Sequence, residues 1–255
     1  MSPMQSALAA PRSSLLLGTL GGGIIGATWL FLVLARPTQW DSVFGSSPAL
    51  ITFVAYVCGA FLLLAASIPR LSSRTLALIP MALALNIITG QLLGAVGIPL
   101  YLDSIGTVMV AILAGPVAGL ATGVLSSVVW ALINPAALPF AAVSGLIGLL
   151  AGLAFARGIG NHSVKVIISG VGVGIISATL AAPVAAVVYG GTAGVGTGAV
   201  VALFREMGNS LLAAVTWQSF LSDPLDKALV FLIAWRCVKR LPASALTPSI
   251  SPTLR

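Results

Sequence analysis

The chain has 255 residues, of which 58% are hydrophobic and only 7% are charged, and its formal net charge is +7. Soluble proteins carry about 25% charged residues, so this composition excludes an ordinary soluble fold. Apolar runs of about 20 residues also argue against a membrane β-barrel, whose strands alternate in polarity. We predict an all-α, polytopic membrane helix bundle, in which the positive charge reflects loop topology rather than nucleic-acid binding.

Residues 1–72 are predicted to form an N-terminal extension with two transmembrane helices. A short polar leader precedes the apolar run Ser13–Ala35, which is too long for the core of a signal peptide, so we expect it to be a retained span. A polar loop over 36–47 separates it from the second span, Ala49–Ile68.

The centre of the chain carries two spans that a helix break divides. After a third span, Leu76–Val96, the stretch from Asp103 to Asn134 has no charged side chain beyond its first residue. That stretch is too long for one straight crossing of a core about 30 Å thick. Gly115-Pro116 lies near its middle, and this pair is typical of a helix boundary. We predict helices at about 103–114 and about 116–134.

The last third of the chain is predicted to hold three further spans. Ala137–Ala156 and Val164–Val188 are continuous apolar runs, and the Gly-rich segment 189–198 follows no strand, which argues against a phosphate-binding loop. The segment 199–221 contains Arg205 and Glu206, which would each cost about 2.5–3.5 kcal/mol in lipid, so we expect one helical segment outside the membrane.

The final span is expected at Ala228 to about Val238, followed by a cytoplasmic tail over 243–255. Asp223 is well placed to cap this helix, and Asp226 and Lys227 could pair locally. With eight spans and a cytoplasmic N-terminus, nine basic residues fall inside and three outside, as the positive-inside rule requires. Both termini are therefore predicted to be cytoplasmic, in the plasma membrane, and all five acids fall on the outer half.

No catalytic constellation is recognisable. The lone histidine, His162, lies in a predicted loop without a nucleophile near it in sequence, and Cys58 and Cys237 lie far apart in apolar runs. We therefore expect no enzyme activity, no metal and no cofactor.

Polar and aromatic residues instead gather near the expected outer membrane face. A mostly apolar pocket with a few placed polar groups is the usual form of a small-molecule site. Asn86 could equally make an interhelical hydrogen bond, and the aromatic residues could belong to an interfacial belt. The candidate substrate-binding residues are Asn86, Gln91, Tyr101, Asp103, Trp130, Asn134, Glu206, Asn209 and Trp217.

A stripe of small side chains crosses the predicted break at four-residue intervals. Such a stripe lets another helix approach closely in lipid. We predict a docking face for a partner protein, formed by Ala111, Gly115, Gly119, Gly123 and Ser127.

Three segments together resemble the substrate-binding S components of energy-coupling-factor (ECF) transporters. They are IPLYLDSIGTVMVAILAGPVAGLATGVLSSVVW, YGGTAGVGTG and SDPLDKALVFLIAWRCVKRLP, and the resemblance covers roughly Leu76–Pro242. It implies a six-helix substrate-binding membrane core, here assigned to 73–242, preceded by the two extra helices. It also implies a site at the outer helix ends, with the loop Gly94–Tyr101 as a gate.

The resemblance further implies vitamin or micronutrient import, with docking on a transmembrane T component that carries two ATPase subunits. A membrane sensor of similar fold and an ion-coupled carrier remain the alternatives. From the acids on the outer half and the tryptophans, we expect a small nitrogen-containing ring compound, cationic or neutral, with Asp103 and Glu206 as its carboxylate partners.

Overall fold

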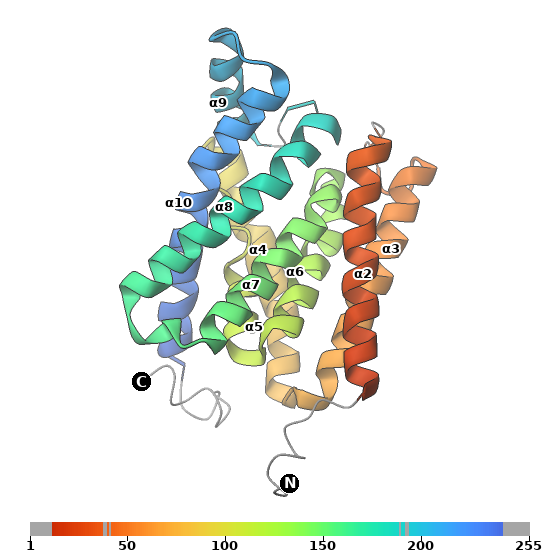
Figure 1. Cartoon of the computed structure of the whole chain (residues 1–255), viewed down its shortest axis with the longest axis vertical. Helices are drawn as coiled ribbons and strands as arrows, with labels where there is room; N and C mark the ends of the chain where they lie inside the picture. The colour runs from red at the N-terminus through yellow and green to blue at the C-terminus, as the bar shows by residue number, and fades with distance from the viewer. Residues whose placement is uncertain (1–11, 38–39, 41, 189, 192–193, 242–255) are drawn as a thin grey trace, which may run out of the picture.

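The computed structural model describes residues 12–37, 40, 42–188, 190–191 and 194–241, and these residues are almost entirely helical without a β-strand. The prediction of an all-α chain is confirmed. Figure 1 shows the helices, which run in chain order as α2 (Arg12–Ala35), α3 (Ser47–Ser67), η1 (Ile68–Arg70), α4 (Ser73–Val96), α5 (Ile105–Ala114), α6 (Pro116–Ala131), η2 (Pro135–Phe140), α7 (Ala141–Ala156), η3 (Ile159–Asn161), α8 (Ser163–Val188), α9 (Val195–Glu206) and α10 (Leu211–Lys239).

Several of these helices have the length and composition of membrane spans. Among the described residues, five helical stretches are long and apolar enough to cross a bilayer, namely α2, α3, Thr75–Val96 of α4, Pro135–Ala156 and α8. Helices α5 and α6 are apolar but shorter. The chain is therefore a helical bundle of the multi-pass membrane type, as its composition predicts.

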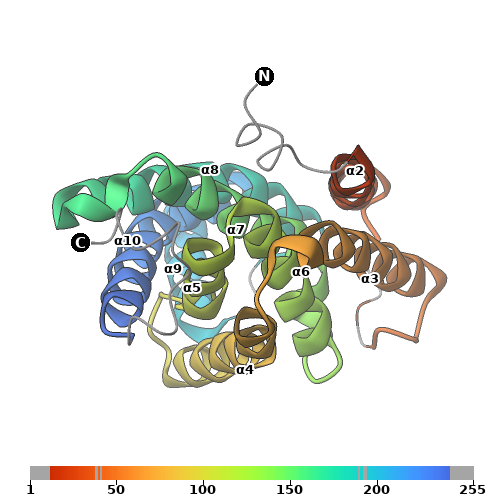
Figure 2. The ribbon, with the colours of Figure 1, turned by 90° about the horizontal axis from the view of Figure 1, so that it is seen from below.

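The break at Gly115-Pro116 is confirmed. Gly115 separates α5 from α6 with a φ of 85°, a left-handed value that favours glycine, and Pro116 is the first residue of α6. Because α5 has only 10 residues, it extends about 15 Å and covers about half of the apolar thickness of a bilayer. Figure 2 shows α5 inside a ring of α4, α6, α7, α8 and α10.

The segment between α4 and α5 enters the bundle to reach this short helix. The backbone N–H groups of Tyr101 and Leu102 both donate to Asp226 Oδ1, at 2.8 and 2.7 Å, and Asp226 lies well inside α10. A non-helical backbone at this depth needs acceptors from the protein, because lipid offers none. A single buried carboxylate supplies them for both groups.

The α2–α3 pair packs against the remaining helices rather than standing apart. Ile25, Leu32 and Tyr56 belong to one buried cluster with Val124 and Val128 of α6. The indole Nε1 of Trp29 also donates to the carbonyl oxygen of Leu180 in α8, at 3.2 Å. The predicted extension and the predicted core therefore share buried side chains.

The end of the chain differs from the prediction. The segment 199–221 is not one helix, because α9 ends at Glu206 and α10 runs unbroken from Leu211 to Lys239. Ser210 caps α10, with its side chain accepting from the N–H of Ala213, so Asp223 is not a cap. The sequence was misread because α10 carries charged residues in the middle of a long helix, and these turn inward: Asp223, Asp226 and Lys227 are all at least 95% buried.

The predicted docking stripe also needs correction. Gly119 and Gly123 lie where α6 packs against α7, and a Cβ atom on Gly119 would come within 2.6 Å of the Gly148 carbonyl oxygen. Ala111 is 1% exposed, and Ser127 is 5% exposed and hydrogen-bonds Ser144 of α7. Four of the five positions therefore serve helix packing inside the chain, and only Gly115, at the break, has open space around it.

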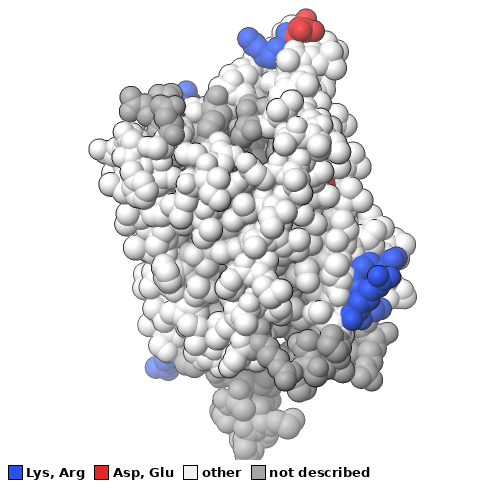
Figure 3. Space-filling view, turned by 180° about the vertical axis from the view of Figure 1, so that it is seen from behind, with Lys and Arg blue, Asp and Glu red and all other residues white. Residues whose placement is uncertain are grey.

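The helix ends alternate between the two ends of the bundle. Arg12 at the start of α2, Arg157 after α7, Lys165 in α8 and Lys239 in α10 lie toward the lower end in Figure 1, where α2 begins and α10 ends. Arg205 lies at the opposite end, close to the turn between α9 and α10. In the view of Figure 3, Lys and Arg atoms lie toward the two ends and the surface between them is almost uncharged.

Candidate functional site

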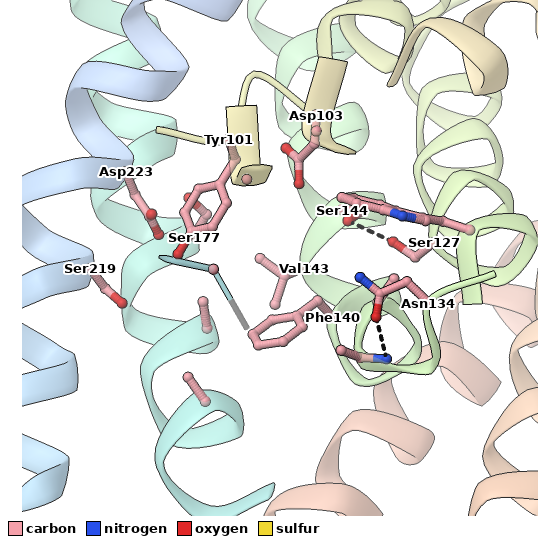
Figure 4. A pocket seen from close by; sticks show the side chains of 18 of the residues that line it. Tyr101, Asp103, Ser127, Asn134, Phe140, Val143, Ser144, Ser177, Ser219 and Asp223 are labelled. Atoms are coloured by element: carbon pink, nitrogen blue, oxygen red, sulfur yellow. Dashed lines mark hydrogen bonds between the residues drawn. The ribbon is translucent and has the colours of Figure 1, made fainter. Parts of the chain in front are cut away.

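A cavity of about 310 Å³ lies in the half of the bundle where α4, α6 and α8 end and α7 begins. Its walls come from all the helices around α5 and from the segment before α5, and Figure 4 shows it from close by. The lining residues are Gly90, Gln91, Gly94, Ala95, Tyr101, Asp103, Ser127, Trp130, Asn134, Ala136, Ala137, Phe140, Val143, Ser144, Ile147, Ser177, Ala181, Ala185, Gly194, Val195, Gln218, Ser219, Asp223 and Lys227.

An ionic cluster forms one side of the cavity. Lys227 of α10 is 4% exposed, and its Nζ atom lies 3.4 Å from Asp103 Oδ1 and in close contact with Asp226 Oδ2. The other oxygen of Asp226 accepts the two backbone N–H groups of Tyr101 and Leu102. Through these contacts, Lys227 and Asp226 hold the segment before α5 against the middle of α10.

Asp223 lies one helical turn before Lys227 and has a different environment. It is 5% exposed and lines the cavity, yet its carboxylate makes no hydrogen bond or ion pair with another residue that the structure describes. Figure 4 shows Asp223 and Ser219 on one side of the cavity, with Ser127 and Asn134 on the opposite side. Among the charged side chains that line the cavity, this carboxylate is the one without a described hydrogen bond or ion pair.

The opposite wall holds an oriented aromatic side chain and polar groups already in use. The indole Nε1 of Trp130 donates to Gln91 Oε1 at 3.0 Å, which fixes the ring between α6 and α4. Asn134 Oδ1 accepts the N–H of Ala136 and so caps η2. Ser127 Oγ and Ser144 Oγ lie 2.9 Å apart. These hydrogen bonds fix the shape of this wall, and some of its polar atoms remain without a hydrogen bond to another residue that the structure describes.

Several residues that the sequence analysis proposed for the site meet in this cavity. They come from α4, the segment before α5, α6 and the start of η2, and they are Gln91, Tyr101, Asp103, Trp130 and Asn134. Ser127, proposed for docking, also lines the cavity.

Asn86 does not line the cavity and belongs to the helix packing. It is fully buried, and its Nδ2 donates to Thr107 Oγ1 at 2.8 Å and to Ser126 Oγ at 3.2 Å. Its Oδ1 accepts the N–H of Gly106 at 2.7 Å. Asn86 therefore joins α4, α5 and α6, which is the interhelical alternative that its position in the sequence left open.

The remaining proposed residues lie away from the cavity. Glu206 ends α9 with an exposed side chain, and Asn209 hydrogen-bonds the carbonyl oxygen of Phe204 in the turn that follows. Trp217 is 58% exposed, on the outer surface of α10. These residues were chosen for their expected position near the outer membrane face, and that position alone does not bring a side chain into the cavity.

The candidate site residues did not include Ser219, Asp223 and Lys227, which line the cavity from α10. A signal for them exists: the three residues follow one another at four-residue intervals, so they share one face of a continuous helix. Reading Asp223 as a helix cap concealed this spacing.

Comparisons with protein family models, with curated proteins and with solved structures find no match for this chain. The described residues also contain no group of three or more His, Cys, Asp or Glu side chains that could hold a metal ion. The cavity and its lining residues are therefore the basis for a functional proposal.

Proposed function

We propose that this chain is a membrane substrate-binding subunit that captures a small vitamin-like compound in the cavity between α4, α6, α7, α8 and α10. The cavity is the observation that carries this proposal. Its volume of about 310 Å³ falls at the lower end of the range for small-molecule sites. Its walls combine apolar side chains with a few polar groups that converge from several helices and from the segment before α5, which is the form that such sites take.

The wider proposal is that the chain is the S component of an ECF-type importer, as the sequence resemblance implies. Its partners are then a T component and two ATPase subunits, and the chain itself releases its ligand unchanged. Since α7 covers most of the small-residue stripe, the T component must dock on another surface of the bundle. The alternative is a membrane sensor that reports occupancy of the same cavity to a signalling partner.

Purification of the chain from its native membranes in a mild detergent tests the importer. We expect a second polytopic protein and two ATPase subunits with Walker A sequences to copurify. Ligand accumulation in cells is expected to stop when the Walker A lysines of those subunits are replaced. A copurifying kinase without ATPase subunits would instead favour the sensor, and ATP-independent accumulation would favour a carrier.

We further propose that the chain lies in the plasma membrane with both termini in the cytoplasm and the cavity toward the outside. Most of the basic residues that the structure describes lie toward the end of the bundle where α10 ends, and the positive-inside rule would assign this end to the cytoplasm. In a variant without native cysteines, we expect Ser210→Cys to react with a membrane-impermeant thiol reagent in intact cells and His162→Cys to remain unlabelled. Both positions are exposed. His162 directly precedes α8 and Ser210 directly precedes α10, and these two helix starts lie at opposite ends of the bundle, so the reverse labelling pattern contradicts the orientation.

A further inference from the structure

We propose that the cavity selects a small organic cation and that the cationic nitrogen binds against Asp223. This inference rests on the proposed binding function and specifies the ligand class for the same site. It replaces Glu206, which lies away from the cavity, with a carboxylate that lines it.

The charges around the cavity favour a cation. Three carboxylates, those of Asp103, Asp223 and Asp226, surround one ammonium group, that of Lys227, so with all four groups ionised the formal charge is −2. Lys227 is engaged by Asp103 and Asp226, and Asp226 also holds two backbone N–H groups. Asp223 receives none of these interactions.

An ionised carboxylate that is buried without a partner is costly, because the protein offers little of the solvation that water provides. Asp223 is 5% exposed, and its side chain lines the cavity without a described hydrogen bond or ion pair. A ligand that brings a positively charged nitrogen would supply both the missing hydrogen-bond donor and the missing charge. An anionic ligand would be repelled by Asp223 and Asp103. Lys227, the lysine that lines the cavity, is already paired with Asp103 and Asp226.

The aromatic side chains suit the body of such a ligand. Tyr101, Trp130 and Phe140 line the cavity together with Asp223, and the hydrogen bond to Gln91 fixes the Trp130 ring. A cation over an aromatic face is attracted by the ring, most strongly when water is excluded. The cavity volume of about 310 Å³ leaves room for a ring-sized compound.

A charge-sorted pool of small molecules tests the ligand class. The small-molecule filtrate of yeast extract is separated by ion exchange into cationic, neutral and anionic pools, and each pool is offered to the purified full chain. Native mass spectrometry then measures the bound mass. We expect binding from the cationic pool alone.

The variant Asp223→Asn is expected to weaken that binding at least about tenfold, because a carboxylate partnered with a charged ligand group is lost. Glu206→Gln, which also removes one acid but lies outside the cavity, is the matched control and should bind like the wild type. Thermal stability of both variants is compared with the wild type first.

The outcomes separate the two proposals. Binding from the neutral or anionic pool, or unchanged binding to Asp223→Asn, overturns the cation assignment and leaves the binding function standing. Binding from no pool contradicts the binding function itself. If Asp223→Asn is unstable, the result for the wild-type chain with the three pools still decides the ligand class.

Discussion

Replacing Asp226 with alanine is expected to destabilise the folded chain by about 3–5 kcal/mol, because it leaves a buried charge without its partner. Lys227 is 4% exposed and would keep only the contact of 3.4 Å with Asp103. The partly buried N–H groups of Tyr101 and Leu102 would also lose their acceptor. The measurement is equilibrium unfolding in mixed detergent micelles.

Two control variants separate the contributions at this position. Asp226→Asn retains an oxygen that can accept the backbone N–H groups but removes the charge, so an intermediate loss of stability is expected. Glu206→Gln, on an exposed residue at the end of α9, should leave the unfolding midpoint unchanged. If Asp226→Ala is as stable as Glu206→Gln, then Asp226 does not hold the segment before α5 in place.

Filling the cavity is expected to abolish ligand binding while the bundle stays folded. Ala181 lies on α8 and lines the cavity, so the variant Ala181→Trp places an indole in the space that the ligand would occupy. Small-to-large changes in well-packed cores cost about 1–3 kcal/mol, but the cavity can accept part of the added volume. The affinity is expected to fall below detection.

Thr179→Trp is the matched control for Ala181→Trp. The same side chain is then added two residues away on the same helix, where Thr179 is exposed and its hydroxyl bonds only the carbonyl oxygen of Ile175. This variant should bind ligand like the wild type. Equal binding by Ala181→Trp and the wild type would place the ligand outside the cavity.

The sequence predicts the helices well where apolar runs and backbone breakers act locally. Gly115-Pro116 marks the boundary of α5 and α6 because proline needs no N–H partner at a helix start and glycine tolerates the positive φ that precedes it. The apolar runs of α2, α3 and α8 begin and end within one or two residues of their expected bounds. These features depend on neighbours along the chain.

The sequence fails where a polar residue finds its partner far along the chain. Asn86 bonds Thr107 and Ser126, which lie 21 and 40 residues away, so its packing role becomes visible only when α4, α5 and α6 are assembled. Asp226 and Lys227 were similarly read as a local pair at a helix start. In the folded chain they lie mid-helix and bind a segment 124 residues away.

The same physical reason explains which residues of the candidate site were predicted from the sequence and which were missed. Gln91, Tyr101, Asp103, Trp130 and Asn134 were predicted because they lie near helix ends on one side of the membrane. The charged α10 residues were missed because they were attributed to a helix cap and a local ion pair, whereas inside the bundle those charges are paired or face the cavity. Composition alone does not distinguish a polar side chain that faces the bundle interior from one that lies outside the bundle.

Native mass spectrometry of the purified chain, released from a membrane mimic under gentle conditions, tests the central claim most directly. The wild-type chain is expected to retain one small molecule of defined mass, which dissociates when the protein unfolds. Thr179→Trp should retain the same mass, and Ala181→Trp should appear only as the bare chain. A wild-type spectrum without bound mass after exposure to all three charge-sorted pools, or an Ala181→Trp chain that keeps the molecule, would contradict a small-molecule site in this cavity.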